Sequence, residues 1–112
     1  MEQLEVFVLD NSELAEFEAI NKGYRNDVYI RKDGKYYQVN VYHILRLQQD
    51  FQSEIEDYGY YAIDPNLILV KEVSNKEIIQ TIIFLNRQMY FDEIKPVKDE
   101  ESINLKLISI MD

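Results

Sequence analysis

The sequence predicts an α+β fold, a mixed β-sheet of four to five strands with two main helices packed on one face. Three observations predict it. Residues 36–73 read as strand, helix and strand, Asp33-Gly34 lies between two alternating segments, and a capping motif at Ser74 starts a second helix. The chain has 112 residues, enough for one domain, residues 1–112, with a single core.

The helix of the central unit has one apolar stripe, which we expect to face the core. Its members recur at helical spacing: Ile44, Leu47, Gln48, Phe51, Ile55 and Tyr58. The other face is charged and holds Arg46, Asp50, Glu54, Glu56 and Asp57. Gly59 follows the stripe, where a glycine most easily forms a left-handed cap.

The second strand of the central unit is a continuous apolar run, Leu-Ile-Leu-Val at residues 67–70. Such a run is typical of a strand that is covered on both faces, so we expect it at the centre of the sheet. A strand–helix–strand unit of this length most simply forms a right-handed crossover between parallel strands.

The segments before the central unit predict a strand, then an element that is either a helix or a strand, and then a hairpin. Residues 4–9 are β-rich, residues 10–12 are turn or cap types, and residues 13–21 fit either a short helix or a strand that ends by Gly23. Residues 27–32 and 36–42 alternate around Asp33-Gly34, a strong two-residue turn signal. One face of this hairpin is aliphatic and the other is polar and aromatic.

The last third of the chain predicts a helix, a loop and a closing strand. Ser74, with Glu77 three residues later, forms a capping box, and the apolar helix after it ends near Gln88 or Met89. Residues 90–97 read as a return loop and residues 99–101 as a turn or a helix start. Residues 103–110 alternate as a strand, which places Ile108 and Ile110 on the same face.

The net charge of −9, from 12 basic and 21 acidic residues, disfavours binding to nucleic acid and to anionic membranes. It favours a basic partner, although acidity also serves simply to keep a small protein dissolved. The charge is unevenly distributed. Residues 47–70 hold five acids and no Lys or Arg, which makes the central helix and the loop after it the strongest candidate for an acidic patch.

Catalytic and metal-binding motifs are missing from the sequence, so we expect neither an enzyme nor a cofactor. The single histidine, His43, stands at the start of a helix, where a structural role is commonest. There are no cysteines, no glycine-rich phosphate loop and no carboxylates at calcium-loop spacing. With no apolar run long enough to cross a bilayer and no signal peptide, we expect a cytoplasmic location.

Tyrosine is the unusual feature of the composition, with nine residues against five Phe and no Trp. Three of the tyrosines, Tyr58, Tyr60 and Tyr61, lie among the acidic residues of the stretch 47–70, which has no Lys or Arg. Carboxylates interleaved with tyrosines can take Lys or Arg side chains by ion pairs and cation–π contacts, although tyrosines at these positions can also simply cover the core. The predicted partner-binding residues are Glu54, Asp57, Tyr58, Tyr60, Tyr61 and Asp64.

A resemblance adds to this interpretation. The runs RLQQDFQSEIEDYGYY, DPNLILVKEV and YFDEIKP, with a capped helix before the last, look like those of small proteins of Gram-positive bacteria. More loosely, the small acidic αβ chain is similar to immunity proteins of bacterial polymorphic-toxin systems. The resemblance covers roughly residues 25–97 and carries over no functional residue.

The resemblance implies a non-catalytic protein that neutralises a basic toxin by covering its active groove. The alternative is a small-molecule-binding or regulatory domain with a pocket between sheet and helices. The oligomeric state is left open by the sequence.

Overall fold

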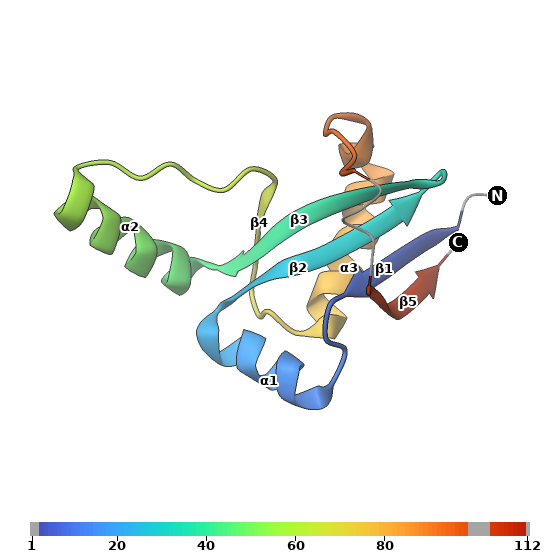
Figure 1. The fold of residues 1–112 in the computed structure, drawn as a ribbon, viewed down its shortest axis with the longest axis horizontal. Helices are drawn as coiled ribbons and strands as arrows, with labels where there is room; N and C mark the ends of the chain where they lie inside the picture. The colour runs from blue at the N-terminus through green and yellow to red at the C-terminus, as the bar shows by residue number, and fades with distance from the viewer. Residues whose placement is uncertain (1–2, 99–103, 112) are drawn as a thin grey trace.

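Pairing of segments that are close in sequence builds most of the sheet. The computed structural model describes residues 3–98 and 104–111. Its elements are β1 (Leu4–Val8), α1 (Glu13–Lys22), β2 (Tyr24–Lys32), β3 (Lys35–His43), α2 (Ile44–Tyr58), β4 (Leu67–Val70), α3 (Asn75–Arg87), the 3-10 helix η1 (Tyr90–Asp92) and β5 (Lys106–Met111). The strand order is β4-β3-β2-β1-β5 (Figure 1). Because β3 and β4 run parallel and the other neighbours antiparallel, the predicted α+β class with a mixed sheet is confirmed.

The core lies between one face of the sheet and α3. The aliphatic residues of the central strands point to this face, and Ile78 and Ile82 of α3 pack against them. Phe91 of η1 closes the core against Tyr37, with the two ring centroids 5.5 Å apart. In Figure 1, α3 lies behind the sheet. The buried strand residues of the core are Leu4, Val6, Val28, Ile30, Tyr37, Val39 and Val41.

Local signals in the sequence place the turns and helix ends correctly. Asp33 and Gly34 both have positive φ angles, 54° and 75°, as a type I′ hairpin turn requires. The Ser74 hydroxyl accepts a hydrogen bond from the Glu77 N–H at 3.3 Å and caps α3, which ends at Arg87. The predicted hairpin and the predicted N-cap are therefore confirmed.

Residues 13–21, which the sequence left open, belong to the helix α1. Ser12 caps it by accepting a hydrogen bond from the Ala15 N–H at 3.1 Å, and Gly23 ends it with a φ angle of 81°. Ala19 is the buried residue of α1 and joins the core. The Gly23 carbonyl accepts from the His43 N–H at 2.8 Å, which ties the end of α1 to the start of α2.

The prediction that the apolar stripe of α2 faces the core is wrong. None of residues 44–58, all of which the structure describes, is buried, and Phe51 and Tyr58 are 52 % and 68 % exposed. The helix begins directly after β3, without a turn that would fold it back over the sheet, and α3 already covers the core face. In Figure 1, α2 extends away from the end of the sheet and lies at one end of the 48 Å long axis.

The prediction that residues 67–70 form a central strand is also wrong. The strand β4 pairs with β3 alone and is an edge of the described sheet. Ile68 and Val70 pack against the core, whereas Leu69 points to the other face and is 48 % exposed. A continuous apolar run therefore covers the core here with one of its two faces only.

The closing strand β5 forms, but its faces differ from the simple alternation of the sequence. Ile108 and Met111 pack against the core, whereas Ile110 is exposed. The cause is a β-bulge: Val6 pairs with Ser109, but the next residue, Phe7, pairs with Leu107. The predicted turn at residues 99–101 and the first residue of the predicted strand, 103, lie outside the described residues.

Candidate functional site

The candidate site is α2 together with the loop of residues 59–66 that returns from it to β4. Two caps define the helix. The His43 Nδ1 atom accepts a hydrogen bond from the Leu45 N–H at 3.1 Å, and Gly59, with a φ angle of 80°, donates its N–H to the Ile55 carbonyl. These caps satisfy backbone groups at both ends, so a helix with no buried residue can still be well formed.

Hydrogen bonds fix the end of the returning loop to β3. The buried Asn40 donates its Nδ2 to the Pro65 carbonyl at 2.8 Å, and its backbone N–H donates to the Asn66 carbonyl at 3.0 Å. The Tyr42 hydroxyl donates to Asp64 at 3.2 Å. The loop is therefore attached at both ends, by Gly59 to α2 and by residues 64–66 to the sheet.

The structure divides the six sequence-predicted site residues into two sets. Asp57, Tyr58 and Tyr60 are exposed at the far end of α2, and Tyr58 and Tyr60 are 68 % and 67 % exposed. Glu54 on α2 and Tyr61 and Asp64 in the loop are half-buried. The expectation that some tyrosines cover the body of the protein applies to Tyr61, whereas Tyr58 and Tyr60 are exposed.

Two phenols next to the Asp64 carboxylate, those of Tyr42 and Tyr61, have raised pKa values. Burial, then the charge and the hydrogen bond of Asp64, raises the pKa of Tyr42 to about 12. Burial also raises the pKa of Tyr61, in the same direction as the charges of Asp50, Asp64 and Glu54. Burial is the largest cause of both pKa shifts, and the carboxylates of Asp50 and Asp64 act on both phenols in the same direction.

Arg46 is the one cation on α2, and its own chain engages it. Its Nε atom is 2.9 Å from an Asp50 oxygen, and its guanidinium lies 4.5 Å from the ring centroid of Tyr24. The Tyr24 ring stacks in turn on Tyr42 at 5.6 Å. Arg46 thus holds the base of α2 against β2, and the acids further along the helix have no cation within α2.

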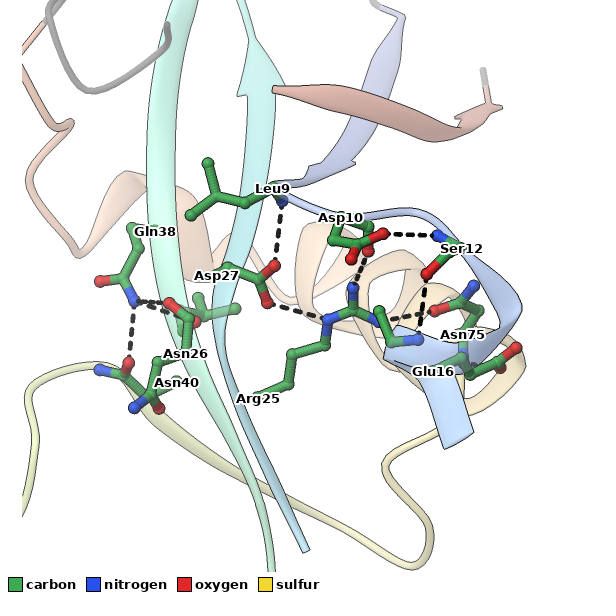
Figure 2. Close-up of polar contacts among 12 residues, drawn as sticks. Leu9, Asp10, Ser12, Glu16, Arg25, Asn26, Asp27, Gln38, Asn40 and Asn75 are labelled. Carbon is green, nitrogen blue, oxygen red and sulfur yellow. Dashed lines mark hydrogen bonds and ion pairs between the residues drawn. The ribbon is translucent and has the colours of Figure 1, made fainter. Parts of the chain in front are cut away.

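A second polar cluster surrounds Arg25, and its geometry indicates a structural role (Figure 2). Arg25 is 5 % exposed, and its Nε atom donates to Asp27 at 2.8 Å. Its two terminal nitrogens donate to the Asp10 carbonyl and to Asn75 Oδ1. Because the guanidinium is engaged by three separate groups, it joins β2, the turn before α1 and the start of α3, and has little capacity left for a ligand.

The alternative function requires a pocket between the sheet and the helices. The core fills the space between the sheet and α3. A cleft of about 460 Å³ lies between α1 and β2, and its polar wall includes Arg25 and Asp27, which bind each other. No ligand class follows from this lining.

His43 caps α2, as expected for a structural histidine. Within residues 3–98 and 104–111, no group of three or more His, Asp or Glu side chains could hold a metal ion. No helix in the same described ranges is both long and apolar enough to cross a membrane.

Sequence reasoning missed the exposed residues of the α2 stripe as candidates for binding. Ile44, Phe51 and Ile55 were expected in the core and instead face solvent. The same helical periodicity describes a core face and a docking face, so the pattern contains no signal that separates the two.

Comparison with known proteins gives no relative: no protein-family model, no curated protein and no solved structure matches this chain.

Proposed function

We propose that this protein is a non-catalytic binding protein that neutralises a basic protein partner, such as a toxin, in the manner of an immunity protein. The partner surface is formed by the six residues Glu54, Asp57, Tyr58, Tyr60, Tyr61 and Asp64. One observation carries the proposal. The end of α2 presents two exposed tyrosines beside an exposed carboxylate, within a 24-residue stretch that has no Lys or Arg.

The chemistry of this surface suits Lys and Arg side chains. Asp57 and Glu54 offer carboxylates for ion pairs, and the rings of Tyr58 and Tyr60 offer faces for cation–π contacts. Tyrosine also supplies a large contact area with few rotatable bonds, which is why it is enriched among residues that dominate binding energy. A partner bound here would have its cationic surface covered, so an enzyme with a basic substrate groove would be inhibited by occlusion.

The two kinds of residue should contribute to different rate constants. Exposed carboxylates steer a basic partner and mainly raise the association rate, which then falls as salt is added. A tyrosine that becomes buried in the complex mainly slows dissociation. Tyr61 and Asp64 are half-buried and should mainly hold the loop in place, since Asp64 already accepts a hydrogen bond from the Tyr42 hydroxyl.

Co-purification from the native host, with identification of the bound protein by mass spectrometry, tests the proposal first. We expect a basic protein. Kinetics on that protein then locate the surface: Glu54→Lys with Asp57→Lys should slow association several-fold at low salt, and Tyr60→Ala should speed dissociation. The matched control is Glu72→Lys with Glu93→Lys, which changes the net charge equally at two exposed positions outside α2.

The proposal fails if the captured partner is acidic, or if both double variants slow association equally. In the second case the net charge alone, and not the surface at the end of α2, accounts for binding.

A further inference from the structure

The exposed stripe of α2 has the spacing of a helix-pairing seam. Ile44, Gln48, Phe51, Ile55 and Tyr58, here called the α2 seam, follow one another at intervals of four, three, four and three residues. This is the 3.5-residue repeat that places one side of a helix continuously against another helix. All five residues are exposed in the single chain.

The protein's own loop does not cover the α2 seam. The half-buried residues of α2 are Arg46, Leu47, Asp50 and Glu54, and the charges of Arg46, Asp50 and Glu54 act on Tyr61 of the loop. The more buried side of α2 therefore carries three of its five charged residues, Arg46, Asp50 and Glu54, whereas its apolar seam faces solvent. This is the reverse of the usual arrangement for a helix in a monomeric protein.

The residues that flank the seam are nearly uncharged. Leu45 and Gln52 line one side, and Leu47 and Glu54 line the other. Asp50, Glu56 and Asp57 project further from the seam. A strongly basic helix placed on the seam would find a single carboxylate beside it, so charge complementarity disfavours a basic occupant here. A helix with a neutral apolar seam is favoured, and α2 itself has that chemistry.

The exposed area is large enough to matter for association. Taking roughly 200 Å² for a whole aromatic side chain, the exposed fractions of Ile44, Leu45, Phe51, Ile55 and Tyr58 together amount to on the order of 500 Å². A specific interface buries about 800 Å² on each partner. The flanking Leu47, Gln48, Gln52 and Glu54 can provide much of the remainder along a helix about 22 Å long.

We infer that α2 pairs with α2 of a second copy of this chain, in an antiparallel two-fold dimer. Ile44 then packs against the second copy's Ile55, and Phe51 against the second copy's Gln48. On the two flanks, Leu45 faces the second copy's Gln52 and Leu47 faces the second copy's Glu54, so no like charges meet.

Two further effects favour the antiparallel orientation over the parallel one. The helix dipoles oppose each other, and the two bodies, each part of a chain with net charge −9, lie at opposite ends of the helix pair instead of side by side.

The inference does not rest on the proposed function. Of the six residues of the partner surface, Tyr58 is the last residue of the α2 seam and Glu54 flanks the seam, whereas Asp57, Tyr60, Tyr61 and Asp64 are outside it. The dimer would carry two copies of the partner surface. Loss of dimerisation and loss of partner binding are therefore separable results.

Light scattering after size exclusion tests the inference directly. We expect the chain at high micromolar concentration to have twice its 13.4 kDa mass. Phe51→Ser with Ile55→Ser should weaken the dimer by at least about tenfold while the far-UV circular dichroism stays unchanged, since both side chains are exposed in the single chain. The matched control is Phe17→Ser on α1, which removes an aromatic side chain that is 62 % exposed and should leave the dimer intact.

Crosslinking tests the antiparallel orientation of the two helices. Because the sequence has no cysteine, only the introduced cysteines can react. A variant with Leu45→Cys and Gln52→Cys should be joined between chains by a short bis-maleimide, because the two positions face each other across an antiparallel pair. Leu45→Cys alone should crosslink poorly, since its two copies are then about 10 Å apart along the axis.

Several results would overturn the inference. The inference fails if the chain stays monomeric, or if the single and double cysteine variants crosslink equally. It also fails if the dimer survives Phe51→Ser with Ile55→Ser, or if it is lost with Phe17→Ser. A different protein captured on the seam by a monomeric chain would also overturn it.

Discussion

Replacing Arg25 should destabilise the protein strongly, because its guanidinium connects three parts of the fold. It donates to Asp27 at 2.8 Å, to Asn75 at 3.3 Å and to the Asp10 carbonyl (Figure 2). Asp27 also accepts from the Leu9 N–H at 3.0 Å, so the pair joins β2 to the end of β1. Arg25→Met keeps most of the buried stem and removes the charge and all three hydrogen bonds.

The expected cost is about 3 kcal/mol of unfolding free energy. Breaking a buried ion pair by removing one partner typically costs about 3–5 kcal/mol. The lower end applies here because the Asp27 side chain is 23 % exposed and retains the Leu9 N–H. For a domain of about this size, that cost corresponds to a fall in Tm of roughly 10–15 °C.

Urea unfolding followed by far-UV circular dichroism, at one fixed protein concentration, measures the change. Arg31→Met is the control: Arg31 pairs with Glu5 at 3.2 Å, but its side chain is 47 % exposed, so its loss should cost about 1 kcal/mol or less. If Arg25→Met costs no more than Arg31→Met, the buried cluster does not hold the elements together and the reasoning is refuted.

Three further predictions follow from single contacts. Ser74→Ala should lower the unfolding free energy by about 1 kcal/mol through loss of the α3 cap, and Ser74→Gly by only a few tenths; equal losses in urea titrations would argue against capping. Gly23→Ala should destabilise the protein more than Gly59→Ala, although both glycines have φ angles near +80°. A Cβ at Gly23 would lie 2.9 Å from the Arg46 Cβ, whereas a Cβ at Gly59 would meet no described atom within 4 Å. The melting temperatures of the two variants test this prediction. The folded-state pKa of Tyr42, about 12, lies above the ordinary 10, so the stability it contributes is complete below pH 10 and is lost as the pH rises toward 12. Asp64→Asn should lower the pKa of Tyr42 only in part, since burial is the largest cause, and ring resonances of labelled tyrosine followed through an alkaline titration will show whether it moves.

The sequence alone determined the elements that depend on contacts between near neighbours. The Asp33-Gly34 turn formed because both residues tolerate the positive φ angles of a type I′ turn, and α3 began at Ser74 because its hydroxyl reaches the Glu77 N–H. Strand alternation also identified the core face of the hairpin, where Val28, Ile30 and Val39 are buried. The α+β class followed from these local elements.

For the six candidate site residues, the sequence determined which residues lie together along the chain but not which of them are exposed. Their position in one acidic, tyrosine-rich stretch is a property of the sequence, whereas only the structure shows that Asp57, Tyr58 and Tyr60 are exposed. The half-burial of Tyr61 and the bond between Asp64 and Tyr42 depend on where the loop returns to β3, which no local pattern encodes.

For α2, β4 and β5, tertiary structure alone decided which apolar faces are covered. The stripe of α2 has the periodicity of a core helix, yet α2 leaves the sheet directly after His43 and exposes Phe51 to solvent. Likewise, the apolar run of β4 was placed at an edge, and a bulge opposite β1 shifted the faces of β5. The physical reason is common to all three cases. Periodicity records that a face is apolar and must be shielded from water, whereas the element that shields it, from the same chain or from another molecule, is set by long-range packing.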